Sequence, residues 1–407
     1  MLSARKFRLI FMLFFFSLLT SAATTLASGF AVYTQDAEAL GQANAATAHT
    51  DSPSTIFFNP ALMNTLEGTR IEIGSTAISP NRRFNSDATG TDMKSEDEAH
   101  FPSSLYLTHT VTPTLSAGIG VFNPFGLGSK WPEHWEGRFI TTESQLSTYT
   151  VNPVLSWQVN PRLALAAGID YLYLDTCLKS HRMVGPLEGC QAFSGSGSAW
   201  GFNLALAIDL SPDWTLGVSY RSRFDVDIKG DLNLRVPTLP ELNYKGSTQI
   251  TLPSQLTAGL AWQVTPQLTV ELGVRWEEWS TFDQLALKLQ GAPIADPLIP
   301  RKWDNAYGFN IGARYRLSDR WALMGGYLYE INPVPEETFE PAIPDADTHI
   351  VAFGVGWQQA HWKLAAACAL QMERDRDKQN AIGVPAAASG VYEAVLPMLS
   401  LSVTYRF

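Results

Sequence analysis

The stretch TPQLTVELGVRW, residues 265–276, carries the pattern that decides the fold. A tight turn at 265–267 is followed by a run in which apolar residues, from Leu268 to Trp276, alternate with polar ones. Successive side chains of a strand point to opposite faces, so one face of this run is apolar while the other carries Glu271 and Arg275. Because buried unpaired charge is costly, the alternation predicts a strand between lipid and a wet lumen rather than the inside of a soluble sandwich.

Similar turn signals punctuate the rest of the chain, at 112–114, 160–162, 211–213, 318–320 and 359–361. Between them lie pairs of strand-like runs joined by longer polar loops, which is typical of transmembrane β-barrels of the bacterial outer membrane. The sequence therefore predicts an all-β, fourteen-stranded antiparallel barrel, an even number as in other bacterial barrels of one chain. The candidate strands are 69–84, 101–111, 115–125, 141–159, 163–180, 198–210, 214–230, 247–264, 268–288, 305–317, 321–331, 348–358, 362–373 and 394–407.

Aromatic residues mark the ends of these strands. Tryptophan rings prefer the headgroup level of a membrane, so five tryptophans close to the tight turns predict a periplasmic girdle. They are Trp157, Trp214, Trp262, Trp321 and Trp362. The last strand ends on Phe407, which we expect to be read by the barrel assembly machinery.

The N-terminus has the features of a secretory signal. Basic residues precede an apolar run from Leu9 to Leu19, and small residues follow it up to a cleavage site after Ala27. This run is too short to span a bilayer as a helix. We therefore expect a signal peptide over 1–27 and a mature protein in the outer membrane. The formal net charge of −10 argues against nucleic-acid binding, which needs basic surface for phosphates.

Residues 28–68 do not alternate. They read SGFAVYTQDAEALGQANAATAHTDSPSTIFFNPALMNTLEG and are rich in Ala and Asn. A fourteen-stranded barrel has a lumen wider than side chains alone can fill. The segment 28–68 is therefore predicted to be a plug inside the lumen, with the barrel itself formed by 69–407.

Several motifs together resemble the outer-membrane hydrophobic-compound transporters of the long-chain fatty acid type (FadL/TodX), and the resemblance covers essentially the whole mature chain. The motifs are SGF at 28–30, LGQANAA at 40–46, Asn59-Pro60-Ala61, Asn123-Pro124-Phe125-Gly126, GRF at 137–139, LGVSYRS at 216–222, WSTF at 279–282, PVP at 333–335 and IPDAD at 343–347. The resemblance implies passive transport of long-chain fatty acids or related lipophilic compounds. In this family the substrate enters an apolar pocket in the lumen, and plug movement lets it leave sideways through a kinked third strand.

Two motifs acquire roles from that resemblance. Asn59-Pro60-Ala61 is the expected plug motif, and its stiff turn follows from the fixed φ of proline. Asn123 and Pro124 are the expected kink, because proline cannot donate to the ladder of a strand. On the residues alone, Pro124 could also simply end the strand. With the family in view, a lateral gap is expected around 120–126.

The sequence departs from the fatty-acid members of the family in ways that bear on the substrate. The third extracellular loop, expected at 181–197, is short, and Asp175 falls near the place of a basic residue that meets the substrate carboxylate. Other basic residues could take that role, although each could equally be a solvated rim charge. These head-group candidates are Lys179, Arg182, Arg301 and Lys302. Neutral aromatic hydrocarbons are therefore the alternative substrates.

The three cysteines leave two alternatives open. Cys177 and Cys190 flank the expected loop and could form a disulfide in an oxidising compartment, with Cys368 left over. The alternative is three free thiols.

Other classes of function find little support in the sequence. A lipid-active enzyme of the outer membrane would need a nucleophile beside an oriented base, and the seven histidines are scattered. No metal-binding spacing or phosphate loop is present, so no metal, cofactor or catalysis is expected. The acidic loop 85–100 could bridge divalent cations to lipopolysaccharide, or simply be solvated. The expected partners are a hydrophobic small molecule, outer-membrane lipid and lipopolysaccharide, with the protein acting as a monomer.

Overall fold

The computed structural model describes residues 29–291, 298–379 and 388–407. The predicted signal peptide lies outside the described residues. The helices are α2 (Ala37–Gly41), α3 (Thr55–Phe58) and the 3-10 helices η1 (Pro60–Thr65), η2 (Trp279–Thr281) and η3 (Glu336–Thr338). In the described part of the chain, no helix combines the length and the hydropathy that crossing a membrane requires.

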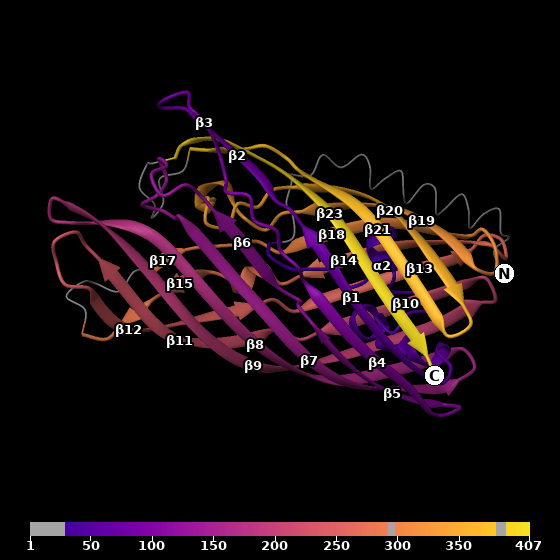
Figure 1. The fold of residues 1–407 in the computed structure, drawn as a ribbon. Coiled ribbons are helices and arrows are strands. Elements are labelled where there is room, and N and C mark those ends of the chain that lie inside the picture. The colour runs from indigo at the N-terminus through magenta and orange to yellow at the C-terminus, as the bar shows by residue number, and fades with distance from the viewer. Residues whose placement is uncertain (1–28, 292–297, 380–387) are drawn as a thin grey trace.

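The strands form one closed, strongly tilted ring (Figure 1). Its first half consists of β1 (Thr69–Ile78), β2 (Asn81–Ser86), β3 (Asp92–Lys94), β4 (Ser103–Thr112), β5 (Leu115–Phe122), β6 (Gly126–Lys130), β7 (Glu143–Asn160), β8 (Leu163–Val184), β9 (Leu187–Ser211), β10 (Trp214–Arg221) and β11 (Phe224–Arg235). The second half consists of β12 (Leu242–Leu252), β13 (Gln255–Gln263), β14 (Leu268–Glu277), β16 (Lys288–Leu289), β18 (Ala306–Arg316), β19 (Trp321–Ile331), β20 (Thr348–Gln359), β21 (Trp362–Glu373), β22 (Arg376–Lys378) and β23 (Gly390–Arg406). A separate pair, β15 (Gln284–Ala286) and β17 (Leu298–Pro300), lies at the extracellular end.

Antiparallel pairing between sequence neighbours builds the wall, and β1 pairs with β23 from Arg70↔Arg406 to Ile78↔Met398 to close it. Some wall strands consist of two elements in line, such as β10 and β11. Counted in this way, the described chain has fourteen wall strands, so the predicted fourteen-stranded antiparallel barrel is confirmed. Its tight turns lie at one end and its long connections at the other, the arrangement of outer-membrane barrels.

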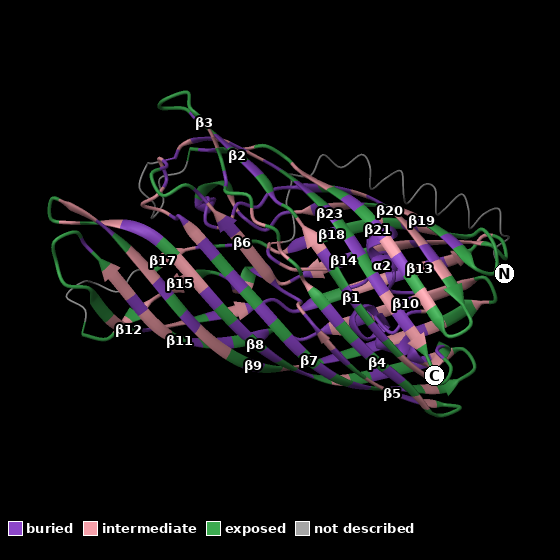
Figure 2. Ribbon diagram, viewed as in Figure 1, coloured by how far each residue is buried: buried purple, intermediate pink, exposed green. Residues whose placement is uncertain are grey.

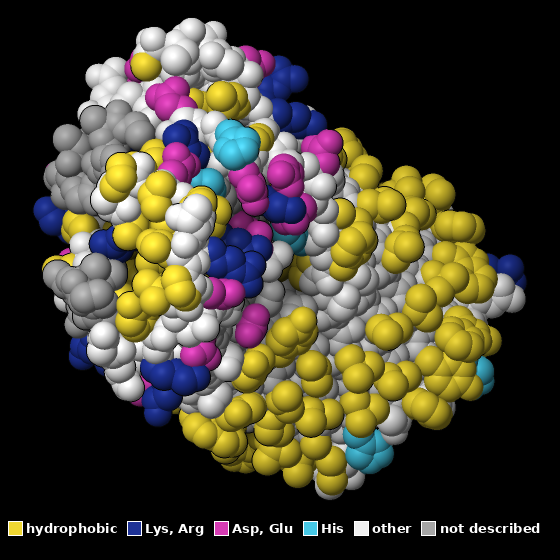
Figure 3. Space-filling view, turned by 60° about the vertical axis from the view of Figure 1, so that its left-hand side comes forward, with side chains coloured by type: hydrophobic (Ala, Val, Ile, Leu, Met, Phe, Trp, Pro, Cys, Tyr) yellow, Lys and Arg dark blue, Asp and Glu magenta, His cyan; other side chains and the backbone are white. Residues whose placement is uncertain are grey.

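The alternation seen in the sequence sets which face each residue takes. Buried and exposed positions alternate along the strands (Figure 2), and in β23 Leu399 and Leu401 point outward while Ser400 and Ser402 are buried. Apolar side chains cover the outside of the barrel as a broad belt, whereas charged residues gather at the extracellular end (Figure 3). This is the surface that a lipid bilayer requires.

Two strands extend well beyond the belt. β8 has 22 residues and β9 has 25, whereas a tilted strand needs only about 9–11 to cross a bilayer. Their hairpin runs on to a turn between Val184 and Leu187, and it projects at the extracellular end (Figure 1). The prediction of a loop over 181–197 is therefore wrong. Glycine and serine are common in loops, but here they occupy ladder positions beside β8 and β11.

The inner segment, which we define as residues 29–66, lies inside the ring of strands (Figure 1). Its helix α2 contacts β19, β20, β21, β23 and β1, while η1 contacts β5, β7, β8 and β9. Glycines on the inner face of the wall make this close approach possible. A side chain at Gly217 would clash with the carbonyl of Thr47, and a Cβ at Gly354 would lie 3.0 Å from the Cα of Gly41. The first wall strand begins at Thr69.

Candidate functional site

The third wall strand is interrupted between β5 and β6. Phe122 lies opposite Thr150 of β7 and Gly126 lies opposite Ser147, so four residues along the third strand span three along its neighbour. One extra residue of this kind bends a strand and removes ladder bonds. The interruption falls at Asn123 and Pro124, where the sequence predicts a kink.

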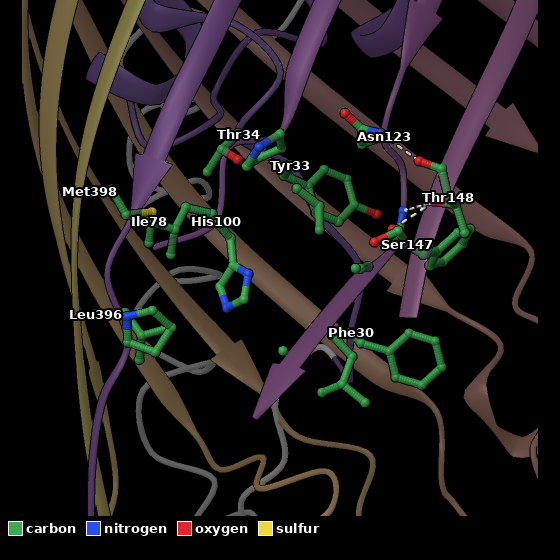
Figure 4. A pocket seen from close by; sticks show the side chains of 18 of the residues that line it. Phe30, Tyr33, Thr34, Ile78, His100, Asn123, Ser147, Thr148, Leu396 and Met398 are labelled. Atoms are coloured by element: carbon green, nitrogen blue, oxygen red, sulfur yellow. Dashed lines mark hydrogen bonds between the residues drawn. The ribbon is translucent and has the colours of Figure 1, made fainter. Parts of the chain in front are cut away.

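A gap in the wall follows from this bend. Beyond Phe122, β7 is the one wall strand in the described residues that pairs with the third strand, while β4 on its other side begins only at Ser103. The side chain of Asn123 bridges the gap: its Oδ1 accepts from the backbone N–H of Ser103 at 2.9 Å, and its Nδ2 donates to the carbonyl of Thr148 at 2.5 Å (Figure 4). An amide side chain thus replaces the backbone ladder there.

The start of the inner segment supplies the remaining backbone partners at the kink. Ala31 forms an antiparallel bridge with Phe125. The N–H of Val32 donates to the carbonyl of Pro124 at 2.8 Å, and the N–H of Gly126 donates to the carbonyl of Phe30 at 2.9 Å. The kinked strand is therefore completed from within the lumen.

A cavity of about 730 Å³ lies beside this gap (Figure 4). On the lumen side it is lined by buried or half-buried residues of the inner segment and the far wall, among them Tyr33, Leu40, Leu328 and Ile350. It is also lined by residues that the wall exposes on its outside, namely Ile73, Phe101, Leu105 and Tyr149. Their exposed fractions are 61%, 64%, 43% and 54%. The cavity thus passes through the wall.

The cavity is mainly apolar, and its charged lining is more acidic than basic. Arg82, Glu330, Asp345 and Glu373 line it together with His100. Arg82 donates from Nη1 to the carbonyl of Gly128 at 2.9 Å, and its buried Nε has no hydrogen-bond partner among the described residues. A bound molecule would therefore meet three carboxyl groups and one guanidinium.

Asp345 joins the extracellular loop between β19 and β20 to the inner segment. Its Oδ2 accepts from the backbone N–H of Gly29 at 2.8 Å. Burial raises the pKa of the Asp345 carboxyl well above its ordinary value, and the neighbouring Glu373 adds to the rise while the Gly29 N–H opposes it. The outer end of the inner segment is thus held by a titratable group.

Deeper in the lumen, four charged side chains fix the inner segment to the opposite wall. Glu38 and Asp51 belong to the segment, Arg314 to β18 and Lys363 to β21. Arg314 Nη1 lies 3.4 Å from Glu38 and 2.7 Å from Asp51, and Lys363 Nζ lies 2.6 Å from Glu38 and also contacts Asp51. The Glu38 side chain is only 3% exposed. Removing one partner from such a buried network leaves the remaining charges buried without enough compensation, which is strongly destabilising.

The side chain of Asn59 uses its hydrogen-bonding groups on both the segment and the wall. Its Nδ2 donates to the carbonyl of Thr47 at 2.7 Å and to the carbonyl of Leu206 in β9 at 3.0 Å. Its Oδ1 accepts from the N–H of Ala61 at 3.1 Å, next to Pro60. The Asn59-Pro60-Ala61 motif therefore ties the fold of the inner segment to the wall. Its role in gating stays a prediction.

The four head-group candidates lie elsewhere. Lys179 pairs with Glu143 at 2.7 Å, Arg301 with Glu340, and Lys302 with Glu337 at 3.5 Å. Arg182 lies opposite Gly189 near the tip of the β8–β9 hairpin. None of the four lines the cavity. Sequence position placed them near the rim, but only the folded wall shows which charges face inward.

The disulfide hypothesis is contradicted. Cys177, Cys190 and Cys368 are all free. Cys177 lies opposite Ser194 and Cys190 lies opposite His181, so the two thiols occupy positions several residues apart on the ladder. Of the two alternatives, three free thiols is the one that agrees with the structure, because 181–197 continues the hairpin instead of forming a loop that would bring Cys177 and Cys190 together.

Sequence reasoning also missed residues that shape the site. One such group is a cluster of buried aromatic rings, with Trp131 stacked on Trp135 at 4.5 Å and Phe30 against Trp279 at 4.5 Å between ring centroids. The sequence does carry a signal for the buried ion pairs, namely the basic residues on the lumen faces of β18 and β21. Arg314 and Lys363 point to the lumen, and buried charges of that kind require partners.

Comparison with known proteins identifies the family. The model of the family described as "Outer membrane protein transport protein (OMPP1/FadL/TodX)" matches residues 18–407. This chain belongs to that family. The resemblance that the sequence motifs suggested is therefore confirmed.

Members of the OMPP1/FadL/TodX family are similar to this chain in sequence and in fold. A protein of Salmonella typhi named "Long-chain fatty acid transport protein" is 22% identical over 344 residues, which cover 75% of this chain and 78% of that protein. Among solved structures, a Pseudomonas aeruginosa FadL homologue gives a TM-score of 0.84 at 20% identity, covering 93% of this chain and 100% of that one. The P. putida toluene transporter TodX gives 0.76 at 16%, covering 91% and 98%.

These likenesses establish the fold and the compartment. The chain is an outer-membrane transport protein of the OMPP1/FadL/TodX family, and the predicted location in the bacterial outer membrane is confirmed. Its relatives are transporters and channels.

Proposed function

We propose that this protein takes up small hydrophobic molecules passively, by way of the cavity beside the third strand and sideways into the membrane. The observation that carries this proposal is the cavity of about 730 Å³, which is lined both by lumen residues such as Leu40 and by outward-facing residues such as Leu105. An apolar molecule could follow this path without entering water. Burial in lipid favours it by about 0.8 kcal/mol per CH₂, so neither ATP nor an enzymatic step is needed.

In this proposal the inner segment is a plug, and its first residues are the part that moves. Phe30, Ala31 and Val32 line the cavity and also complete the kinked strand. Displacing them would widen the cavity at the point where it meets the lipid. Asn59 and Pro60 would hold the rest of the plug in place meanwhile.

The charges of the cavity favour an uncharged substrate, such as an aromatic hydrocarbon, over a fatty-acid anion. Arg82 faces a lining that also holds Glu330, Asp345 and Glu373. A substrate carboxylate would therefore meet one guanidinium among three carboxyl groups, and each of these that is ionised would repel it, because like charges at short range are unfavourable. The carboxylate-binding role expected for Lys179 or Arg301 has no support from the cavity lining.

The route can be tested by blocking its outer mouth. Ser103 and Ser147 are exposed on the outside of the wall and line the cavity, so the double variant Ser103→Trp/Ser147→Trp places two indoles there. Ser75→Trp is the matched control, because Ser75 is also exposed, lies on β1 within hydrogen-bond distance of Ser103, and does not line the cavity.

We expect the double variant to lose uptake of an alkylbenzene by about tenfold or more while binding of that ligand in the lumen persists. The control should transport normally. Normal uptake by the double variant would show that the substrate instead passes the inner segment towards the periplasm.

The preference for uncharged substrates needs a separate measurement. An alkylbenzene should bind more tightly than a fatty acid of equal carbon number, and Glu373→Gln should improve binding of the fatty acid alone. Tighter binding of the fatty acid by the unmodified protein would make Arg82 a carboxylate receptor and reverse this assignment.

A further inference from the structure

A cluster of chemically reactive side chains lies far from the cavity, on the projecting β8–β9 hairpin. His181 of β8 and Cys190 of β9 are directly opposite each other on the antiparallel ladder. Opposed residues of such a pair have their Cβ atoms close together, so their side chains can touch. The Sγ of Cys190 lies 3.4 Å from Nε2 of His181, and Nδ1 of His181 lies 2.6 Å from Oε1 of Glu188.

The order of these contacts sets the tautomer of the imidazole. A carboxylate only accepts hydrogen bonds, so Nδ1 of His181 carries a proton and donates it to Glu188. In the neutral ring, Nε2 is then the acceptor and faces the thiol of Cys190. Nucleophile, base and orienting carboxylate thus stand in a row, the relation that activates nucleophiles on unrelated folds.

The base and the carboxylate are held firmly, whereas the thiol is accessible. His181 is 8% exposed and packs edge-on against the ring of Phe139. Arg138 donates two hydrogen bonds to Glu188, from Nε to Oε1 at 2.6 Å and from Nη2 to Oε2 at 3.2 Å. Cys190 itself is exposed to the solvent beyond the membrane.

The charges around the thiol explain why it needs a base. Desolvation of the sulfur raises the pKa of the Cys190 thiol, and the carboxylates of Glu133 and Glu188 add to the rise while Arg235 on β11 opposes it. The thiol is therefore protonated at rest. The contacts with Arg138 and then His181 lower the pKa of Glu188 to about 2, so the orienting carboxylate stays ionised across the physiological range.

A metal site does not account for the cluster. In the described residues, no group of three or more His, Cys, Asp and Glu side chains is placed to hold a metal ion. The two nitrogens of His181 point to opposite partners, so the cluster cannot converge on one ion.

We propose that Cys190, His181 and Glu188 form a nucleophilic thiol site at the cell surface that exchanges with small organic disulfides. In the step, the proton of Cys190 moves to Nε2 of His181 and the thiolate attacks one sulfur of the disulfide. A new S–S bond joins Cys190 to that half, the original S–S bond breaks, and the leaving thiolate takes the proton from His181. The sulfur of Cys190 is oxidised and the leaving sulfur is reduced, so no further oxidant is needed.

Disulfide exchange suits this site better than acyl transfer. An acyl transfer develops an oxyanion that needs donors aimed at it, whereas exchange between sulfurs needs only an accessible thiolate and a proton carrier. The Arg138 guanidinium, the obvious cation beside the cluster, is already occupied by Glu188. The other thiol of the hairpin, Cys177, lies four ladder positions away and cannot resolve the mixed disulfide.

The test uses the full protein in detergent micelles with Cys177→Ser and Cys368→Ser, so that Cys190 is the only thiol. The probe is dithiodipyridine, an uncharged disulfide whose leaving group absorbs light. A second protein that keeps only Cys177 gives the rate of an ordinary thiol on the same hairpin. Rates are measured from about pH 5 to pH 9, a range that includes the pH values at which histidine side chains in general change charge.

At neutral pH we expect Cys190 to react at least about tenfold faster than Cys177, the lower end of what a positioned base supplies. Its dependence on pH should differ from that of Cys177, because the imidazole takes up the proton of the thiol. His181→Gln, whose amide can still donate to Glu188, should lose the advantage, and its rate should rise with pH up to the thiol pKa. Arg182→Gln, which removes a charge from the same hairpin but is paired on the ladder with Gly189 and with none of the three site residues, should react as fast as the parent.

A rate for Cys190 no greater than that of Cys177 would overturn the proposal. The same holds if the rate and the pH profile are unchanged in His181→Gln, because the cluster would then only brace the hairpin.

Discussion

The two halves of the inner segment are held in different ways. Residues 29–35 are attached to the kinked strand chiefly by backbone hydrogen bonds, such as that from Val32 to Pro124, and they line the cavity. Residues 36–66 are held by the buried ion pairs of Glu38 with Arg314 and Lys363. A hydrogen bond contributes about 0.5–1.5 kcal/mol and can be exchanged for another. A buried charge cannot leave its partner without a large cost, so we expect the first half to move more readily than the second.

The largest effect should come from breaking the ion pairs of the second half. Glu38→Ala leaves Arg314 and Lys363 buried with Asp51 as their remaining carboxylate. We expect a loss of about 3–5 kcal/mol in the free energy of unfolding, measured from the urea midpoint of tryptophan fluorescence. The control is Glu67→Ala, whose side chain is 83% exposed and only 3.7 Å from Arg406. Equal midpoints for the two variants would mean that the network does not anchor the segment.

A smaller loss is expected at the plug motif. Asn59→Ala leaves the carbonyls of Thr47 and Leu206 without this donor and should cost about 1–3 kcal/mol. Because the second half is loosened, single-channel recordings should also show a larger leak of small ions. Asn64→Ala, which removes one hydrogen bond to Ser156, is the control. If Asn59→Ala leaked no more ions than the unmodified protein, this residue would contribute to folding and not to closing the lumen.

In the first half, we expect transport to change more than stability. Gln35→Ala removes donation from Nε2 to the carbonyls of Asn123 and Val32, at 2.6 and 2.9 Å. The expected loss of stability is about 1 kcal/mol, and uptake of an alkylbenzene should become faster. Gln42→Ala removes one bond within the anchored half and should leave uptake unchanged. Slower uptake in the Gln35 variant would contradict the idea that the first half blocks the path.

The smallest change at neutral pH is expected for Asp345→Asn, because the amide oxygen of asparagine can still accept from the N–H of Gly29 and the amide carries no charge to bury. The pKa of the Asp345 carboxyl in the folded protein is raised above its ordinary value of 3.8. Between the ordinary and the folded pKa, the folded protein therefore binds more protons than the unfolded chain. The free energy of unfolding should therefore fall as the pH rises between these two pKa values, and the Asp345→Asn variant should lose this dependence on pH. Asp213→Asn, in an exposed periplasmic turn, should keep it. If stability depended on pH equally in the unmodified protein and in both variants, Asp345 would not be the group that links stability to pH.

How much the sequence predicts depends on whether the physical cause is local. Alternation along 265–276 and the short turns predict the wall, because a strand between lipid and lumen needs only its own two faces. The break at Pro124 is equally local, since proline lacks a donor. The loop expected at 181–197 was wrong, and the Cys177–Cys190 alternative does not hold, because serine and glycine also fit a strand when two neighbours support it, as β8 and β11 do here.

Features that join distant parts of the chain stayed beyond the sequence. Nothing near Arg314 indicates that it meets Asp51, which is 263 positions away. The pairing of Ala31 with Phe125 likewise depends on a bend in one element and the path of another. The motif at Asn59 was found only through resemblance to a family, although its contacts follow the ordinary preference of buried amides for partners.

The closing of the ring by β1 and β23 has a consequence for the order of assembly. The inner segment comes just before β1, and its helices touch early strands such as β5 as well as the last strand, β23. Once the first and last strands have paired, a segment of this size with buried charges has no easy way in. The seam must therefore close around a segment that is already inside. The inner segment, which precedes the barrel in the chain, is therefore in place before the last strand pairs with the first.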